Sequence, residues 1–165
     1  MSGIKPANRP SENAEHPYVL DEQVGFRMRV AMQRHTAIFM SRMIEGLTQT
    51  QFAALAKLKE VGACSQNHLG RLIYLDAATI KGVVDRLHNR GFITSGTDPN
   101  DRRRRALMLT PEGRRVADAA ERVAAEITTE TLAPLAPEDR EAAVRLLWTL
   151  GGSPDNGNGG GGASG

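Results

Sequence analysis

Signals that begin helices recur at short intervals through the middle of this chain, and their spacing most constrains its fold. Thr48, followed three residues later by Gln51, is a capping box, in which a hydroxyl and an amide each satisfy a backbone N–H of the first turn. Ser65 and Asp76 are further N-cap residues ahead of apolar positions at helical spacing. Glycines stand where the helices after Thr48 and Asp76 should end. The sequence therefore predicts three consecutive helices, of which the last two are short.

The helical pattern stops at Gly91, and a different pattern follows. Residues 92–96 and 104–110 are expected to be short strands, and the TDPNDRR sequence between them is typical of a turn. Thr110-Pro111-Glu112 then opens another helix, with a hydroxyl cap, a proline whose missing N–H does no harm, and an acid in the first turn. This helix is expected to reach Leu132, and a last one to reach Leu150.

A long helix is also expected ahead of these elements, from an Asp21 cap to about Ile44. The predicted fold class is therefore mainly α, with a small β-hairpin. Residues 1–20 are expected to form a flexible arm, and the Gly-rich tail 151–165 to be disordered because it has no apolar surface to bury. The single cysteine excludes a disulfide framework, and neither a signal-peptide core nor a membrane span is recognisable, so a cytoplasmic location is expected.

Positive charge is concentrated between residues 65 and 115. Ten basic and five acidic residues give this stretch a net charge of +5, against +2 for the whole chain. A local basic surface of this kind binds phosphate or is simply a solvated face. Four consecutive arginines at positions 102–105 favour phosphate binding, because adjacent cations repel one another and an anion reduces that repulsion.

Two short helices followed by a hairpin are the arrangement of a winged helix-turn-helix, whose second helix enters the major groove of DNA.

The run DAATIKGVVDRLHNRGFITSGTDPNDRRRRALMLTPEGRR resembles the MarR family of bacterial transcription regulators. The elements that carry the resemblance are VDRL, RGFI, the wing sequence DPNDRR and the exit LTPEG, and the similarity extends over residues 21–150. It implies a winged helix-turn-helix at 48–110 between dimerisation helices at 21–45 and 111–150. It also implies a homodimeric repressor on a palindromic operator, released by a small ligand. The stretch YVLDEQVGFRMR further resembles the subgroup that controls catabolism of aromatic acids such as nicotinate.

The second short helix carries the candidates for reading bases. Thr79 can bond a base edge or touch a thymine methyl, Lys81 can reach a guanine or a phosphate, and Ala78 permits close approach to the groove. An ordinary surface helix is the alternative. The resemblance implies phosphate contacts at the start of the preceding helix and a braced wing. By that resemblance Ser65, Gln66 and Asn67 touch phosphate, Arg103 braces the wing with Asp98 and Asp101, and Arg102, Arg104 and Arg105 contact DNA.

A pocket for a small aromatic acid needs apolar walls, a few polar anchors and a cation. The helix expected at 21–44 carries four of the six methionines, which fill irregular space, together with basic side chains. His35 is the first choice for a ligand contact. The full set of candidates is His35, Arg34, Met32, Arg27, Tyr18 and His16. A stripe of methionines is more often core than pocket, and a lone histidine such as His35 is more often a hydrogen-bonded interface residue.

Constellations for catalysis are not recognisable in the sequence. The four histidines show no metal-ligand spacing, and neither a phosphate-binding glycine loop nor a nucleophile elbow occurs, so no enzyme activity, cofactor or metal is expected. Cys64 is either a redox switch or a small buried filler. Two alternatives to a ligand-released repressor stay open: an architectural DNA-binding protein without an effector, and an enzyme or protein-interaction module built on a helical dimer.

Overall fold

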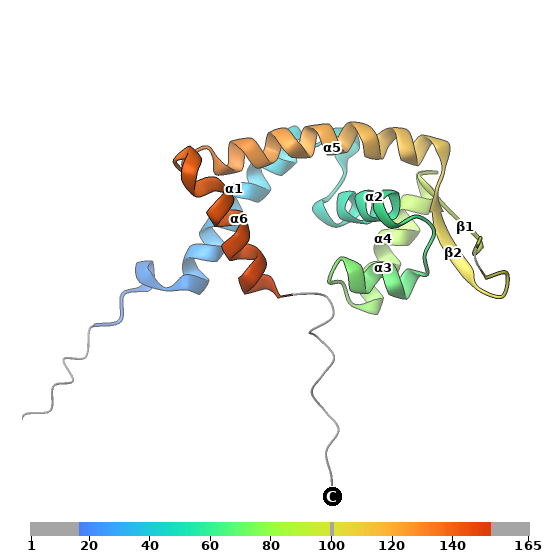
Figure 1. Cartoon of the computed structure of the whole chain (residues 1–165), viewed down its shortest axis with the longest axis horizontal. Coiled ribbons are helices and arrows are strands. Elements are labelled where there is room, and N and C mark those ends of the chain that lie inside the picture. The colour runs from blue at the N-terminus through green and yellow to red at the C-terminus, as the bar shows by residue number, and fades with distance from the viewer. Residues whose placement is uncertain (1–16, 100, 153–165) are drawn as a thin grey trace, which may run out of the picture. The chain divides into compact units, whose positions relative to one another are not determined.

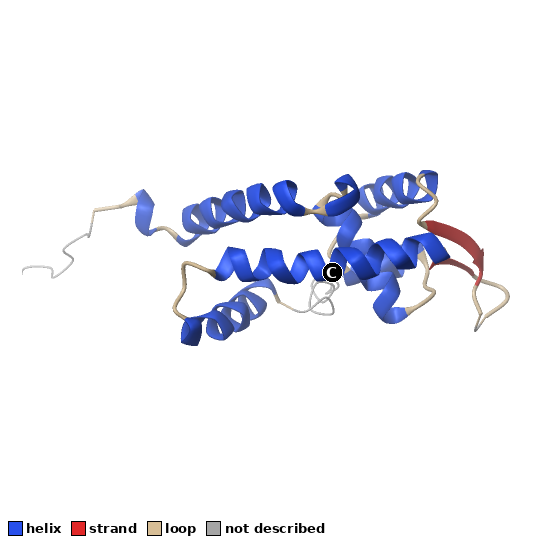
Figure 2. Ribbon diagram, turned by 90° about the horizontal axis from the view of Figure 1, so that it is seen from above, coloured by secondary structure: helices blue, strands red, loops and turns tan. Residues whose placement is uncertain are grey.

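The computed structural model describes residues 17–99 and 101–152, and Figure 1 labels their helices and strands. Among these residues helices dominate, and one two-stranded hairpin, red in Figure 2, follows α4 (Ala77–Asn89). The predicted fold class and order of elements are confirmed. The elements are η1 (Leu20–Glu22), α1 (Val24–Arg42), η2 (Ile44–Gly46), α2 (Gln49–Val61), α3 (Gln66–Leu72), α4 (Ala77–Asn89), β1 (Ile93–Thr97), β2 (Arg105–Leu109), α5 (Pro111–Leu132) and α6 (Pro137–Gly151).

The predicted N-caps are confirmed at four helices. The side chains of Thr48, Ser65, Asp76 and Thr110 each accept a hydrogen bond from the backbone N–H three residues on, at 3.2, 3.2, 2.7 and 2.9 Å. The capping box at Thr48 is complete, because the side chain of Gln51 also accepts from the Thr48 N–H at 3.0 Å. Local hydrogen bonding thus fixes where α2, α3, α4 and α5 begin.

The boundaries of the first and last helices differ from the prediction. Asp21 does not cap α1; it lies in the short 3-10 helix η1, and its backbone carbonyl accepts a hydrogen bond from the Arg27 side chain. The helix ends at Arg42 rather than Ile44, because Met43 takes an extended backbone (φ −63°, ψ 133°) and the short helix η2 follows it. Leu20, predicted within the arm, belongs to η1, and Gly151, predicted within the disordered tail, closes α6. The rest of both predicted tails, except residues 17–19 and Gly152, lies outside the described residues.

The described residues divide into two compact units, one up to Gln33 and one from Arg34 onward. The hydrophobic core lies in the second unit, where α2 packs against α4 and α5 and α3 packs against α4. Its largest fully buried side chains come from the residue after η2 and from α2, α3, α4, β1 and α5. They are Leu47, Leu55, Leu69, Ile80, Leu87, Ile93, Val116 and Ile127. This core holds the helix-turn-helix and the hairpin as one body.

The hairpin is antiparallel, with Ile93 opposite Leu109 and Thr97 opposite Arg105. Each strand lies within one residue of its predicted ends. Strand β2 also pairs on its other side with Cys64, through backbone hydrogen bonds of 3.2 and 2.8 Å between Cys64 and Leu107. The Cys64 side chain is buried, so the prediction of a small buried filler is confirmed. Burial and the nearby charge of Asp98 raise the pKa of this thiol, which lowers its reactivity as a nucleophile.

The glycine of the LTPEG sequence, Gly113, is required by the close packing of α5 on the hairpin. The Thr110 N–H donates to the Phe92 carbonyl at 3.0 Å, which draws the start of α5 against the start of the hairpin. A Cβ atom at position 113 would lie 1.8 Å from the same carbonyl oxygen, so no side chain fits there. This close approach sets where α5 leaves the wing.

Within the described residues, no helix combines the length and apolar character that crossing a membrane requires.

Candidate nucleic-acid interface

Helix α4 divides cleanly into a buried and an exposed face. Its buried stripe is Ile80, Val83, Val84 and Leu87. The opposite face of its first half carries Ala77, Ala78, Thr79 and Lys81, all exposed. Hydrogen bonding from Thr79, first of all from its backbone N–H, lowers the pKa of the capping carboxyl Asp76, so the N-terminus of α4 keeps an ionised cap. A rigid helix with a small, polar, exposed N-terminal half is the kind of surface that fits a major groove.

Lys81 has a partner that the sequence analysis missed. Its ammonium lies 2.6 Å from the Asp85 carboxylate, one turn further along α4, and both side chains are more than half exposed. The spacing of four residues between lysine and aspartate predicts this ion pair, because such residues are neighbours on a helix surface. A surface pair of this kind is worth roughly 0–1 kcal/mol. Lys81 can therefore leave Asp85 for a base or a phosphate at little cost.

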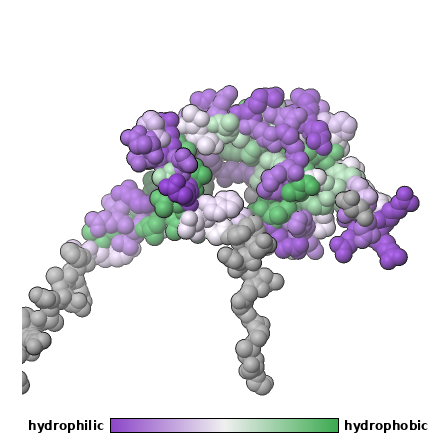
Figure 3. All heavy atoms as spheres, viewed as in Figure 1, coloured by the Kyte–Doolittle hydropathy of each residue, from purple (hydrophilic) through white to green (hydrophobic). Residues whose placement is uncertain are grey.

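The wing, defined here as residues 98–110, presents its arginines to solvent. Arg102, Arg103, Arg104 and Arg105 are all exposed, and Figure 3 shows hydrophilic side chains gathered over this end of the molecule. Backbone hydrogen bonds close the turn: the Asp98 N–H donates to the Arg104 carbonyl at 2.8 Å, and the Arg104 N–H to the Asp101 carbonyl at 2.9 Å. The hairpin thus holds four cations at the end of a two-stranded sheet.

Bracing of the wing differs in detail from the prediction. Arg103 contributes its backbone N–H, which donates to the Asp101 carboxylate at 3.0 Å. The guanidinium that pairs with Asp101 belongs to Arg104, at 3.4 Å. Asp101 thus bonds both residues, and its ion pair falls on an arginine predicted to contact DNA. The reason is the tight turn, which brings residue 104 back over residue 101. With the Arg104 side chain 78% exposed, this pair does not withhold the guanidinium from a phosphate.

The start of α3 lies beside the start of α4. A hollow of about 260 Å³ between them is lined by Asn67, Gly70, Arg71, Leu75, Ala77 and Ile80. Of the predicted phosphate contacts, Ser65 is the N-cap of α3, Asn67 is exposed on this hollow, and Gln66 is partly buried. Arg71 was not among the predicted residues, although it is a basic side chain on the same helix. The structure thus places Asn67 and Arg71 next to the first turn of α4.

Two predicted ligand residues meet the end of α5. The Arg34 guanidinium donates to the backbone carbonyls of Thr131 and Glu130, at 2.7 and 3.0 Å. These carbonyls belong to the last turn of α5, where a cation also interacts favourably with the helix dipole. His35 Nδ1 lies 2.9 Å from the Thr131 hydroxyl, and the His35 ring lies 6.3 Å from that of Phe39. Arg34 and His35 therefore fasten α1 to α5.

The other candidate ligand residues lie elsewhere. Tyr18, Arg27 and Met32 belong to the unit that ends at Gln33, and all three are exposed. Arg27 pairs there with Asp21 at 3.6 Å. His16 lies outside the described residues. Of these methionines, Met43 belongs to the core, while Met28, Met32 and Met40 are exposed. No cluster of three or more potential metal ligands occurs among the residues that the structure describes.

Comparison with known proteins decides the family. The sequence model of the MarR family matches residues 47–104, which span the helix-turn-helix and most of the wing. The chain is 37% identical to the HTH-type transcriptional repressor NicR of Pseudomonas putida over 152 residues, which are 92% of this chain and 95% of the relative. The chain belongs to the MarR family. The resemblance read from VDRL, RGFI, DPNDRR and LTPEG is thereby confirmed, and the protein is a DNA-binding transcription regulator.

Solved structures agree with this membership in the MarR family. A probable transcriptional regulator from Pseudomonas aeruginosa is 48% identical, with a TM-score of 0.76 over 80% of this chain and 99% of that one. BpsR of Bordetella bronchiseptica, whose structure concerns regulation of its DNA binding by 6-hydroxynicotinic acid, is 38% identical, with a TM-score of 0.76 over 83% and 99%. The winged-helix fold of this MarR-family chain is thus the fold of its relatives.

Proposed function

We propose that this protein is a homodimeric repressor that binds a palindromic operator through α4 and the wing and that a small aromatic carboxylate releases it. The observation that carries the proposal is the exposed face of Ala77, Ala78, Thr79 and Lys81 beside a hairpin with four exposed arginines. Both surfaces belong to elements that share one hydrophobic core. A regulator of chromosomal operators works in the bacterial cytoplasm.

The two surfaces divide the work of binding. A good bidentate base contact from α4 contributes about 1–3 kcal/mol of discrimination against a wrong base. Wing arginines on phosphate add affinity without sequence information, and each phosphate they neutralise steepens the salt dependence of binding by about 0.9 in log–log slope. Thr79, Lys81 and Ala78 are therefore assigned to base reading. Arg102, Arg104 and Arg105, with Ser65, Gln66 and Asn67 on α3, are assigned to the DNA backbone.

Dimerisation is assigned to the terminal helices, residues 21–45 and 111–150, on either side of the winged domain at 48–110. Helix α6 leaves large apolar side chains in water, including Trp148 at 71% and Leu150 at 65% exposure. Val144, Leu146 and Leu147 are also more than half exposed. An apolar surface of this size marks an interface. A second copy of the chain would cover it and place two winged domains on two half-sites.

The effector is assigned to the class of 6-hydroxynicotinate, an aromatic ring with one carboxylate, because BpsR is a 38% identical relative. Arg34 supplies a cation and His35 a ring nitrogen, and both hold the last turn of α5. A carboxylate that competes for Arg34 would loosen the contact between α1 and α5. Met32, Arg27, Tyr18 and His16 are proposed as further ligand contacts on the sequence argument alone.

One experiment tests the operator and the effector together. A duplex enriched from a random pool by the protein is titrated in fluorescence anisotropy, with and without 6-hydroxynicotinate, and melting of the free protein is followed with the same ligand. We expect binding to a palindrome, weaker binding with the ligand, and a higher melting temperature, because a ligand of the folded state stabilises it. Sequence-specific binding that no nicotinate or benzoate derivative alters would favour an architectural protein. Absence of any palindrome in the pool would contradict the proposal.

A double substitution tests the wing. Arg104→Ala with Arg105→Ala should weaken binding to specific and scrambled duplexes alike, and reduce the salt slope by about 0.9 for each lost phosphate contact. The matched control removes two positive charges on α2 and α5, as Lys57→Ala with Arg122→Ala. The salt slope is measured between 50 and 300 mM salt. Equal slopes for the wing variant and the control would exclude the wing as a phosphate contact.

A further inference from the structure

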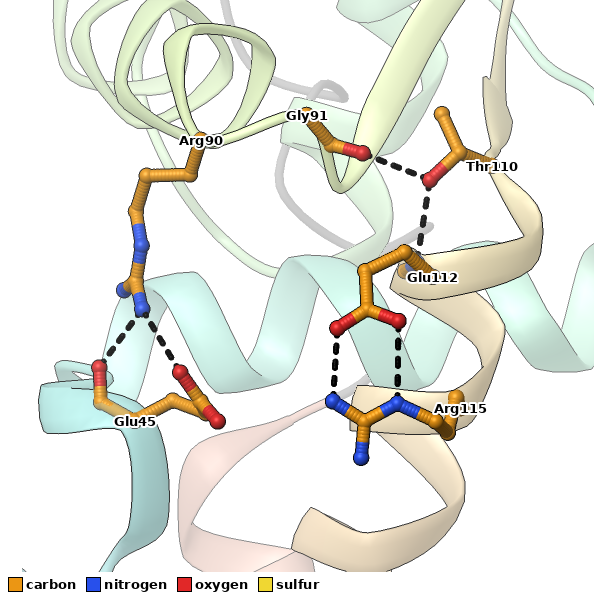
Figure 4. A network of polar contacts seen from close by, with 7 residues as sticks. Glu45, Arg90, Gly91, Thr110, Glu112 and Arg115 are labelled. Atoms are coloured by element: carbon orange, nitrogen blue, oxygen red, sulfur yellow. Dashed lines mark hydrogen bonds and ion pairs between the residues drawn. The ribbon is translucent and has the colours of Figure 1, made fainter.

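The C-terminal end of α4 is tied to the segment between α1 and α2. Arg90, the C-cap residue of α4, donates from its guanidinium to the Glu45 backbone carbonyl at 2.7 Å. The same nitrogen lies 3.5 Å from the Glu45 carboxylate. Its guanidinium carbon also lies 4.5 Å from the centroid of the Phe92 ring, within reach of a cation–π interaction. Figure 4 shows the side chain spanning from the end of the helix to the linker.

The linker presents that carbonyl through an uncommon backbone conformation. Glu45 and Gly46 both have left-handed φ values, 56° and 58°. A non-glycine residue in this region is strained and persists only where its surroundings hold it. The Arg90 guanidinium is one such restraint, since it bonds both the carbonyl and the carboxylate of this residue. The contact is therefore directional and specific to one linker conformation.

Thr110 ties the same end of α4 to α5. Its hydroxyl donates to the Gly91 carbonyl at 2.6 Å, as Figure 4 shows, and accepts from the Gly113 N–H at 2.9 Å. One oxygen atom thus joins the residue after the C-cap of α4 to the first turn of α5. Beside it, Glu112 and Arg115 form a two-contact ion pair of 2.9 and 2.6 Å, which orders that first turn. Arg90 and Thr110 therefore hold the end of α4 from two sides.

We propose that Arg90 and Thr110 are positioning residues for DNA reading, which fix the angle at which α4 projects toward the groove. The two residues are called the α4 clamp below. The inference rests on the proposed function only in taking α4 as the reading helix. The apolar stripe of α4 packs on the core, but apolar contact is not directional. Directional hydrogen bonds at the far end set the angle.

Geometry shows why such a small constraint matters. A helix of 13 residues is about 20 Å long, so a swing of about 5° about its C-terminal end moves its N-terminal end by about 1.7 Å. A hydrogen bond to a base edge does not survive such a displacement. Phosphate contacts from flexible arginines do survive it. Loss of the clamp should therefore reduce sequence discrimination while non-specific binding persists.

The test compares affinity for two duplexes of equal length, one enriched from a random pool by the parent protein and one scrambled. Arg90→Met removes the guanidinium but keeps an apolar stem over Phe92, and Arg90→Lys keeps a donor. Thr110→Val removes the hydroxyl, and Thr110→Ser keeps it. The control Thr48→Val removes a helix cap of the same kind at α2. Thermal melting is measured for every variant.

We expect Arg90→Met and Thr110→Val each to lower the ratio of specific to scrambled affinity about tenfold, the scale of one lost base contact. Salt slope and scrambled-duplex affinity should stay at the parent values. Arg90→Lys and Thr110→Ser should restore most of the ratio. Thr48→Val should lower the melting temperature as Thr110→Val does and leave the ratio unchanged.

Three results would overturn the inference. An unchanged ratio in Arg90→Met and Thr110→Val would show that the clamp does not position α4. A salt slope reduced by about 0.9 in Arg90→Met would make Arg90 a phosphate contact instead. A ratio lowered equally by Thr48→Val would make the effect one of general stability. A parent protein that prefers no sequence would instead refute the proposed function, which keeps the two failures distinguishable.

Discussion

Replacing Gly113 by alanine should strongly destabilise the winged domain. The added Cβ would lie 1.8 Å from the Phe92 carbonyl oxygen and 3.0 Å from the Phe92 Cα. Ordinary contact begins at 3.4 Å, so the start of α5 must move by about 1.6 Å away from the hairpin. Because the nearest atoms are backbone, no side-chain rotation can relieve the clash.

The magnitude follows from what this movement breaks. Thr110 donates to Phe92 at 3.0 Å and its hydroxyl accepts from the Gly113 N–H at 2.9 Å, and each bond contributes about 1 kcal/mol. Residual strain increases this loss of stability by about 1–3 kcal/mol, while the higher helix propensity of alanine offsets about 1 kcal/mol of it. The net loss is about 2–4 kcal/mol, or a fall in melting temperature of roughly 10 °C for a protein of this size.

Circular dichroism melts and urea titrations measure this loss. The matched control is Gly25→Ala, which lies in the first turn of α1 with no atom within 4 Å of the added Cβ and should melt at or slightly above the parent temperature. If Gly113→Ala melts with the parent, the close approach of α5 to the hairpin does not set the stability of the wing.

Two further predictions concern charges. A hydrogen bond from Lys59 lowers the pKa of Asp118 below its ordinary value of 3.8, so this pair adds stability above that pH and loses it as the pH falls through the lowered value. Asp118→Asn should therefore melt below the parent at pH 7, with the gap closing toward pH 2; a gap constant with pH would contradict the reasoning. Asp85→Asn frees Lys81 from its 2.6 Å ion pair and should tighten DNA binding a few-fold with a steeper salt dependence in anisotropy titrations, whereas weaker binding would place Lys81 off the DNA.

The elements that sequence reasoning located best are those with local signals. The caps at Thr48, Ser65, Asp76 and Thr110 and the proline after Thr110 act within one helical turn, so their effect is visible in the sequence itself. The exposed face of α4 likewise follows from the 3.6-residue period of its apolar stripe. Base-reading candidates could therefore be named without a structure.

Other features escaped because their cause is not local. Asp21 has the chemistry of an N-cap, but the chain turns through η1 before α1 begins. The end of α1 is set by the extended backbone at Met43, which the side chain of a methionine does not predict. Within the wing, the tight turn brings the guanidinium of Arg104 rather than that of Arg103 to the Asp101 carboxylate.

The sequence by itself determined the helix order, the caps, the hairpin and the cluster of arginines, because each depends on residues within a few positions of one another. Only the tertiary structure decided which distant groups meet. Arg90 bonds a carbonyl 45 positions earlier, and Arg34 bonds one 97 positions later. Such contacts arise when packed helices bring distant segments together. Because any arginine can donate a hydrogen bond to a carbonyl, the sequence does not show which arginine does so. Packing therefore selected the residues that hold α4 and α5, while local chemistry had already shaped the helices themselves.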